Sequence, residues 1–133
     1  MSTRSYIGRL TEDKQVFSVY CHFDGYPSGV GRILREHYYR PEDVFNLLSF
    51  GNISSLATVI EDTIFYGRDR KEPDQEQTQT TYDEYLPSTG SEGSGVVYKY
   101  LFDEYTEEWS CYNMQGDLVE IPTDDIDIIR YML

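Results

Sequence analysis

The sequence is poor in the residues that build disulfide frameworks and metal sites. It holds only two cysteines, Cys21 and Cys111, in 133 residues, too few for a disulfide scaffold or a zinc site made of cysteines alone. His22 and His37 would bring the nominal ligands to four, but none has the paired spacing of a zinc finger. We therefore expect free thiols, no structural metal and no cofactor.

Long apolar stretches are missing as well. No run reaches the length of a transmembrane helix, and the first ten residues, MSTRSYIGRL, lack the apolar core of a signal peptide. The hydrophobic fraction is only 39%, although 13 Tyr, 6 Phe and 1 Trp offset this because each aromatic side chain buries much surface. The length supports one core, so we predict a single cytoplasmic domain over residues 1–133 with no membrane contact.

Basic residues are scarce in the second half of the chain. Residues 1–71 contain nine Lys/Arg and nine Asp/Glu, whereas residues 72–133 contain two Lys/Arg and 15 Asp/Glu, so the net charge of −13 arises there. An acidic surface disfavours direct binding to nucleic acid or anionic membranes and favours basic protein partners. Solvated acidic loops are the simpler explanation of the same charge.

The fold class predicted from the apolar pattern is α+β. Residues 5–10 and 16–23 alternate like strands and predict an antiparallel hairpin, with Tyr6 beside Tyr20 if the register centres on the loop. Residues 96–121 predict a C-terminal antiparallel meander, in which Phe102 faces Trp109 and Tyr100 faces Cys111.

Two central helices are expected to cover one face of this sheet. A stripe from Val30 through His37 and Tyr38 predicts the first, and Pro41 predicts the start of the second, with Gly51 closing it. Residues 63–66 predict a short strand. Residues 72–95 hold too little apolar content to pack, so they predict a mobile acidic and polar insertion. Thr123 is placed to cap a short C-terminal helix.

The stretch 16–39 contains most of the residue types that could carry chemistry. Cys21 with His22 or His37 would suit nucleophilic catalysis, but strand alternation places Cys21 and His22 on opposite faces, so a buried thiol is favoured. Tyr20, His22 and Asp24 share the other face, where Asp24 could orient His22 for acid–base work. The structural alternative is that these residues fasten the following turn.

A glycine-rich turn and two arginines suggest a third kind of site. Residues 25–31, GYPSGVG, enter a helix, where backbone N–H groups could hold a phosphate, although the spacing fits neither a P-loop nor a dinucleotide fingerprint. Arg4, Arg68 and Arg70 would strengthen such a site for a small anionic nucleotide if they fold beside it.

Acidic residues interleaved with tyrosines suggest a fourth kind of site, which would bind a basic protein surface. Rows of carboxylates on a rigid surface can occupy a basic groove made for phosphates, which is how a nucleic-acid mimic works. The full set of predicted binding residues is Arg4, Tyr20, His22, Asp24, Tyr26, Arg68, Arg70, Asp103, Glu104, Glu107 and Glu108.

Several short motifs resemble a group of small phage, prophage and bacterial accessory proteins. The motifs are TRS-IG in residues 3–8, YCHFDGYP in residues 20–27, EHY in residues 36–38 and YGRDR in residues 66–70, and they lie within residues 1–71. The group often has Trp where this chain has Phe23. No catalytic residue is carried over from the resemblance. It implies a context, since small phage-borne proteins often disable or redirect host defences such as restriction, CRISPR and nucleotide signalling.

The leading functional expectation is a non-enzymatic binding protein. It would inhibit or sequester a host factor in the host cytoplasm, in the manner of an anti-defence or anti-CRISPR inhibitor. The acidic half of this chain would bind a basic surface on that host protein. One alternative is a sponge for a small anionic nucleotide. Another is a small hydrolase or nuclease that uses His22 and Asp24.

Overall fold

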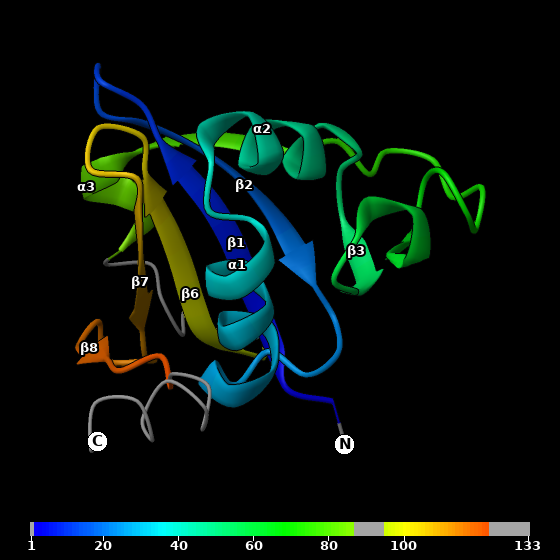
Figure 1. The fold of residues 1–133 in the computed structure, drawn as a ribbon. Helices are drawn as coiled ribbons and strands as arrows, with labels where there is room; N and C mark the ends of the chain where they lie inside the picture. The colour runs from blue at the N-terminus through cyan, green and yellow to red at the C-terminus, as the bar shows by residue number, and fades with distance from the viewer. Residues whose placement is uncertain (1, 87–94, 123–133) are drawn as a thin grey trace.

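A mixed sheet flanked by short helices forms the body of the molecule (Figure 1). The structure is a computed structural model that describes residues 2–86 and 95–122. Its strands are β1 (Arg4–Leu10), β2 (Gln15–Cys21), β3 (Ile53–Ser55), β4 (Ile64–Phe65), β5 (Thr78–Thr81), β6 (Val96–Asp103), β7 (Glu108–Tyr112) and β8 (Leu118–Val119). Its helices are α1 (Arg32–His37), α2 (Pro41–Ser49) and α3 (Tyr82–Tyr85), with a π-turn at Pro27–Gly31 and a 3₁₀ turn at Ile60–Asp62.

The strand order confirms the predicted α+β class. The order is β4-β3-β2-β1-β6-β7-β8, with β5 beside β2, and most neighbouring strands are antiparallel. The predicted registers are confirmed for Tyr6 opposite Tyr20 in the hairpin and for Phe102 opposite Trp109 in the meander. The parallel pairing of β1 with β6 was not predicted, because strand alternation does not say which distant strand is the neighbour.

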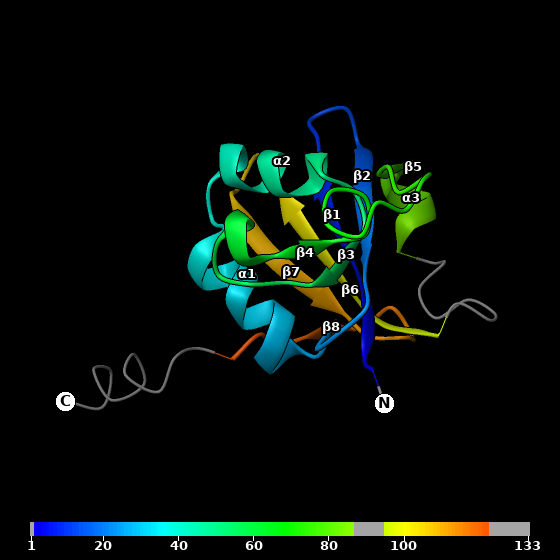
Figure 2. The same ribbon diagram turned by 90° about the vertical axis from the view of Figure 1, so that its right-hand side faces the viewer.

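Helices α1 and α2 cover one face of the sheet, as predicted (Figures 1 and 2). Pro41 is the first residue of α2, and Val44, Leu47 and Leu48 on its inner face are fully buried. These side chains join the main core with residues of β1, β2 and β6. Gly51 follows α2 with φ +83°, a conformation that glycine adopts without a Cβ penalty.

The expectation that His37 belongs to the core is wrong. Its side chain is 43% exposed, whereas that of the next residue, Tyr38, is buried. Helix α1 ends at His37, and Tyr38 leaves the helical conformation with φ −127° and ψ 65°. The turn sends Tyr38 inward and His37 outward, so the buried stripe within α1 ends at Leu34.

The opposite face of the sheet is covered by a segment that was expected to be a loop. Within residues 72–95, β5 pairs with β2 and α3 follows it directly (Figure 2). Buried Tyr85 of α3 packs in a second core with Leu10, Val16 and Leu101. Burying an aromatic side chain contributes about 2 kcal/mol. One well-placed tyrosine therefore anchors a stretch whose average composition is too polar to predict packing.

Two further sequence-based expectations concern a C-terminal helix and membrane-spanning segments. The predicted C-terminal helix at Thr123 lies outside the described residues. Within residues 2–86 and 95–122, no helix has both the length and the apolarity needed to cross a bilayer.

Candidate functional site

The carboxylates of the acidic turn between β6 and β7 fall into two groups: two have structural partners and two are exposed. Asp103 accepts a hydrogen bond of 2.8 Å from the main-chain N–H of Tyr105, and Glu104 forms an ion pair of 2.8 Å with Arg9. These two acids therefore hold the turn in place. Glu107 and Glu108 lie at the other end of the turn and are exposed.

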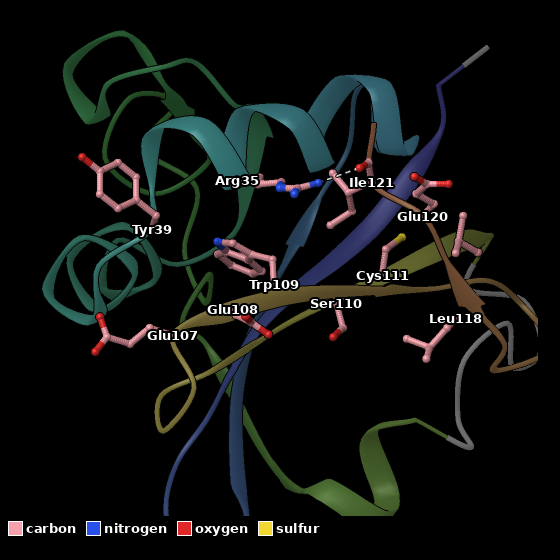
Figure 3. A pocket seen from close by; sticks show the side chains of 11 residues that line it. Arg35, Tyr39, Glu107, Glu108, Trp109, Ser110, Cys111, Leu118, Glu120 and Ile121 are labelled. Atoms are coloured by element: carbon pink, nitrogen blue, oxygen red, sulfur yellow. Dashed lines mark hydrogen bonds between the residues drawn. The ribbon is translucent and has the colours of Figure 1, made fainter. Parts of the chain in front are cut away.

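Glu107 and Glu108 lie at the rim of a hollow between α1, β7 and β8 (Figure 3). The cavity volume is about 430 Å³, within the range of small-molecule and side-chain pockets. Its described lining consists of Arg35, Tyr39, Glu107, Glu108, Trp109, Ser110, Cys111, Leu118, Val119, Glu120 and Ile121. We call this hollow the acidic pocket.

Hydrogen bonds to the main chain fix the walls of the acidic pocket. The indole Nε1 of Trp109 donates to the carbonyl oxygen of Tyr38 at 2.8 Å, and its ring lies 5.2 Å from that of Phe102. Arg35 donates through Nη1 to the carbonyl oxygen of Ile121 at 2.9 Å, the dashed contact in Figure 3. The indole and the guanidinium are thus held before any ligand arrives, which lowers the entropy cost of binding.

The electrostatics of the acidic pocket favour a cation. Its described lining carries three carboxylates, on Glu107, Glu108 and Glu120, against the single guanidinium of Arg35. Trp109 adds an aromatic surface to the same lining, on the side of β7 that faces α1, whereas Glu108 projects from the other side of the strand (Figure 3). A lysine or arginine side chain suits this arrangement, because its apolar stem packs on aromatic surface while its charged head reaches carboxylates.

The acidic pocket offers no reactive nucleophile among its described side chains. The Cys111 thiol lines it but is buried, and burial raises its pKa to about 11. Cys21 is also buried, as strand alternation predicted, and burial raises its pKa to about 12. A thiol with a raised pKa stays protonated at neutral pH and is a poor nucleophile. Both cysteines act as small apolar core residues.

The predicted polar face of β2 forms two separate pairs. The hydroxyl of Tyr20 and Nδ1 of His22 share a hydrogen bond of 2.7 Å. Tyr26 instead donates to Asp24 at 3.1 Å, and this contact raises the pKa of the Tyr26 hydroxyl. The hydrolase hypothesis pairs His22 with Asp24, but among the described residues each of them is hydrogen-bonded to a different tyrosine.

The glycine-rich turn uses its own N–H groups. The amide of Gly25 donates to the carbonyl oxygen of Thr3 at 2.8 Å, and the amide of Val30 donates to that of Asp24 at 2.8 Å. The amide of Gly29 donates to the carbonyl oxygen of Tyr26 at 2.9 Å. These donors hold the turn against the start of β1 and are not directed at a ligand.

The two arginines after β4 also have structural partners. Arg68 donates through Nη2 to the carbonyl oxygen of Thr63 at 2.7 Å and lies over the ring of Phe65 at 4.7 Å. Arg70 lies over the ring of Tyr66 at 5.4 Å. Arg4, at the start of β1, influences Tyr20 electrostatically and is therefore near the Tyr20–His22 pair instead. The predicted anion site thus does not assemble as one cluster.

Sequence reasoning did not select Arg35, Tyr39, Trp109 and Glu120 as part of a binding site. Trp109 was expected only as a cross-strand partner, which it is. The missing information was that α1 and β8 both lie beside β7, because this proximity makes one pocket from three distant segments (Figure 3). The exposed Tyr39, two residues after the end of α1, was the one local signal of a surface role.

No protein-family model, curated protein or solved structure matches this chain. Within the described residues, no group of three His, Cys, Asp or Glu side chains is placed to hold a metal ion. The geometry and charge of the chain's own pockets therefore carry the functional argument.

Proposed function

We propose that this chain is a non-enzymatic binding protein whose acidic pocket receives a lysine or arginine side chain from a basic protein surface. The observation that carries the proposal is the lining of the acidic pocket, which contains three carboxylates, on Glu107, Glu108 and Glu120, together with the fixed indole of Trp109. Aromatic side chains beside a charged rim are typical of the residues that dominate the energy of protein interfaces.

The state of the other candidate groups supports binding over catalysis. Cys21 and Cys111 are buried with raised pKa values, and His22 and Asp24 are engaged with different tyrosines. The acidic charge of the chain favours association with a basic partner and raises its rate of encounter. The accessory-protein motifs in residues 1–71 agree with a partner that is a host factor, which the protein would inhibit or sequester.

Affinity capture with charge-neutral variants tests the proposal. The variant Glu107→Gln/Glu108→Gln removes two rim charges, while Glu12→Gln/Glu76→Gln removes two exposed charges outside the acidic pocket. Both variants have the same net charge. A basic protein from a bacterial lysate is expected on the wild type and on the control variant but not on the pocket variant. Equal capture by the two variants would show that binding follows net charge alone and would reject the acidic pocket.

A further inference from the structure

The sheet has a free outer edge along β5 (Figure 2). Among the described residues, β5 pairs with β2 and with no other strand, so its second side has no neighbouring strand. The other outer strands, β4 and β8, have only two residues each, whereas β5 has four. Thr78 and Gln79 of β5 are exposed. We call this free side of the strand the β5 edge.

The strand register shows which main-chain groups point outward at the β5 edge. The amide of Tyr82 donates at 2.9 Å to the carbonyl oxygen of Lys14, which directly precedes β2. Main-chain groups alternate in direction along an antiparallel pair, so Thr80, two residues before Tyr82, also faces β2. The N–H and C=O groups of Gln79 and the N–H group of Thr81 therefore face away from β2.

These outward groups are available to another strand. Within the part of the chain that the structure describes, no main-chain hydrogen bond reaches the N–H or C=O group of Gln79 or the N–H group of Thr81. The sequence of β5, TQTT, also lacks the charged residues and proline that commonly protect a strand edge. The β5 edge thus presents the donors and the acceptor that an added strand uses.

The surroundings of the β5 edge are acidic. Residues 72–86 contain five Asp/Glu and no Lys/Arg. Asp83 and Glu84 follow β5 directly in the first turn of α3, and both are exposed. Lys14 from the neighbouring hairpin turn adds one positive charge, which the acids outnumber. A basic segment is therefore the electrostatic complement of this edge.

We propose that the β5 edge binds an extended basic segment of a partner protein, which adds a strand to the sheet beside β5. Main-chain hydrogen bonds to Gln79 and Thr81 supply the affinity, and the nearby carboxylates select lysine or arginine side chains. The β5 edge shares no residue with the described lining of the acidic pocket. It is a second contact surface, and it does not depend on the proposed function of that pocket.

Amide hydrogen exchange measured by NMR tests this proposal, with a short end-blocked peptide of alternating threonine and lysine as the probe. In the free protein, the N–H groups of Thr78 and Thr80 are expected to exchange slowly and those of Gln79 and Thr81 rapidly. Saturating peptide is expected to slow exchange at Gln79 and Thr81 at least about tenfold. Rapid exchange that persists at both residues would overturn the proposal. Equal binding of the same peptide with glutamate in place of lysine would also overturn it.

Two variants of Gln79 separate the main-chain bonds from side-chain effects. Gln79→Pro removes the outward N–H group, whereas Gln79→Ala keeps it, and both lose the side-chain contact of 3.3 Å with Gln15. Proline is tolerated on an edge strand where the missing N–H faces outward, so the pairing of β5 with β2 is expected to remain. Gln79→Pro is expected to weaken peptide binding about tenfold and Gln79→Ala to leave it unchanged. Equal affinities of the two variants would overturn the proposal, and the exchange measurement on the wild type stands even if the proline variant packs differently.

The variant Glu107→Gln/Glu108→Gln separates the β5 edge from the acidic pocket. It is expected to leave the peptide-induced slowing of exchange at Gln79 and Thr81 intact, because neither glutamate belongs to the edge. If this slowing disappears in the variant, the β5 edge is not an independent binding surface and the proposal is overturned. If it persists while capture of a basic protein is lost, the edge and the acidic pocket bind separately.

Discussion

Replacing Lys99 by methionine is expected to change how the stability of the protein depends on pH. Burial lowers the pKa of Lys99 from 10.5 to about 8 in the folded protein. The unfolded chain keeps the ordinary value, so between pH 8 and pH 10.5 the unfolded state binds more protons than the folded state. The stability contributed by this group therefore rises with pH in that window and is constant below it.

The size of the effect follows from the two pKa values. The difference in bound protons between the unfolded and folded states is integrated from about pH 7 to about pH 9.5. With a folded pKa of about 8, the unfolding free energy increases by about 2 kcal/mol over this range. If water screens part of the burial, the increase is about 1 kcal/mol. Among the described residues, Tyr6 from β1, Tyr112 from β7 and Tyr85 from α3 face Lys99. Burial raises the pKa of the Tyr85 and Tyr112 hydroxyls above the ordinary value of 10.0, so these two hydroxyls stay protonated over most of the same range.

Urea unfolding of wild type and Lys99→Met across this pH range measures the effect. The emission of Trp109, the only tryptophan, reports unfolding in both proteins. The difference in unfolding free energy between them is expected to shift by about 1–2 kcal/mol in favour of the wild type as the pH rises. Taking the difference cancels groups that titrate alike in both. A flat difference would show that the Lys99 pKa is ordinary and would refute the burial argument.

Two other perturbations test separate parts of the fold. Gly51→Ala is expected to destabilise the protein by more than about 2 kcal/mol in urea unfolding, because φ is +83° and the new Cβ would lie 2.0 Å from the carbonyl oxygen of Gln75. Gly116→Ala has a similar φ of +81° but open space around it, so about 1 kcal/mol is expected, and equal losses would contradict the steric argument. Iodoacetamide at neutral pH is expected to leave Cys21 and Cys111 unmodified in the folded protein and to alkylate both after unfolding. Rapid labelling of the folded protein would show that a thiol is accessible.

Much of the fold could be predicted where the pattern is local. The alternation in β1 and β2 fixed their pairing, and the start of α2 at Pro41 followed from the position of proline before an apolar stripe. The meander registers followed from the short acidic turn between β6 and β7. In each case the interacting residues are close in sequence, so the chain geometry leaves few alternatives.

Long-range neighbours could not be predicted in the same way. The pairing of β5 with β2 rests on four residues in a polar segment and on the burial of Tyr85 against strands far away in sequence. The acidic pocket likewise depends on α1 and β8 both contributing residues beside β7. The sequence identified Glu107 and Glu108 as candidate binding residues from their charge. It gave no sign that Asp103 and Glu104 would be used to hold the turn.

The most direct test of the acidic pocket is a titration of Trp109 emission with a short arginine-rich peptide and with a glutamate-rich peptide of equal length. The account predicts that only the basic peptide changes the emission and that its affinity falls as salt is raised. It also predicts that Glu107→Gln/Glu108→Gln weakens this binding by about three- to tenfold, while Glu12→Gln/Glu76→Gln does not. Equal responses to both peptides, or an affinity unaffected by salt and by the pocket variant, would contradict the proposed function.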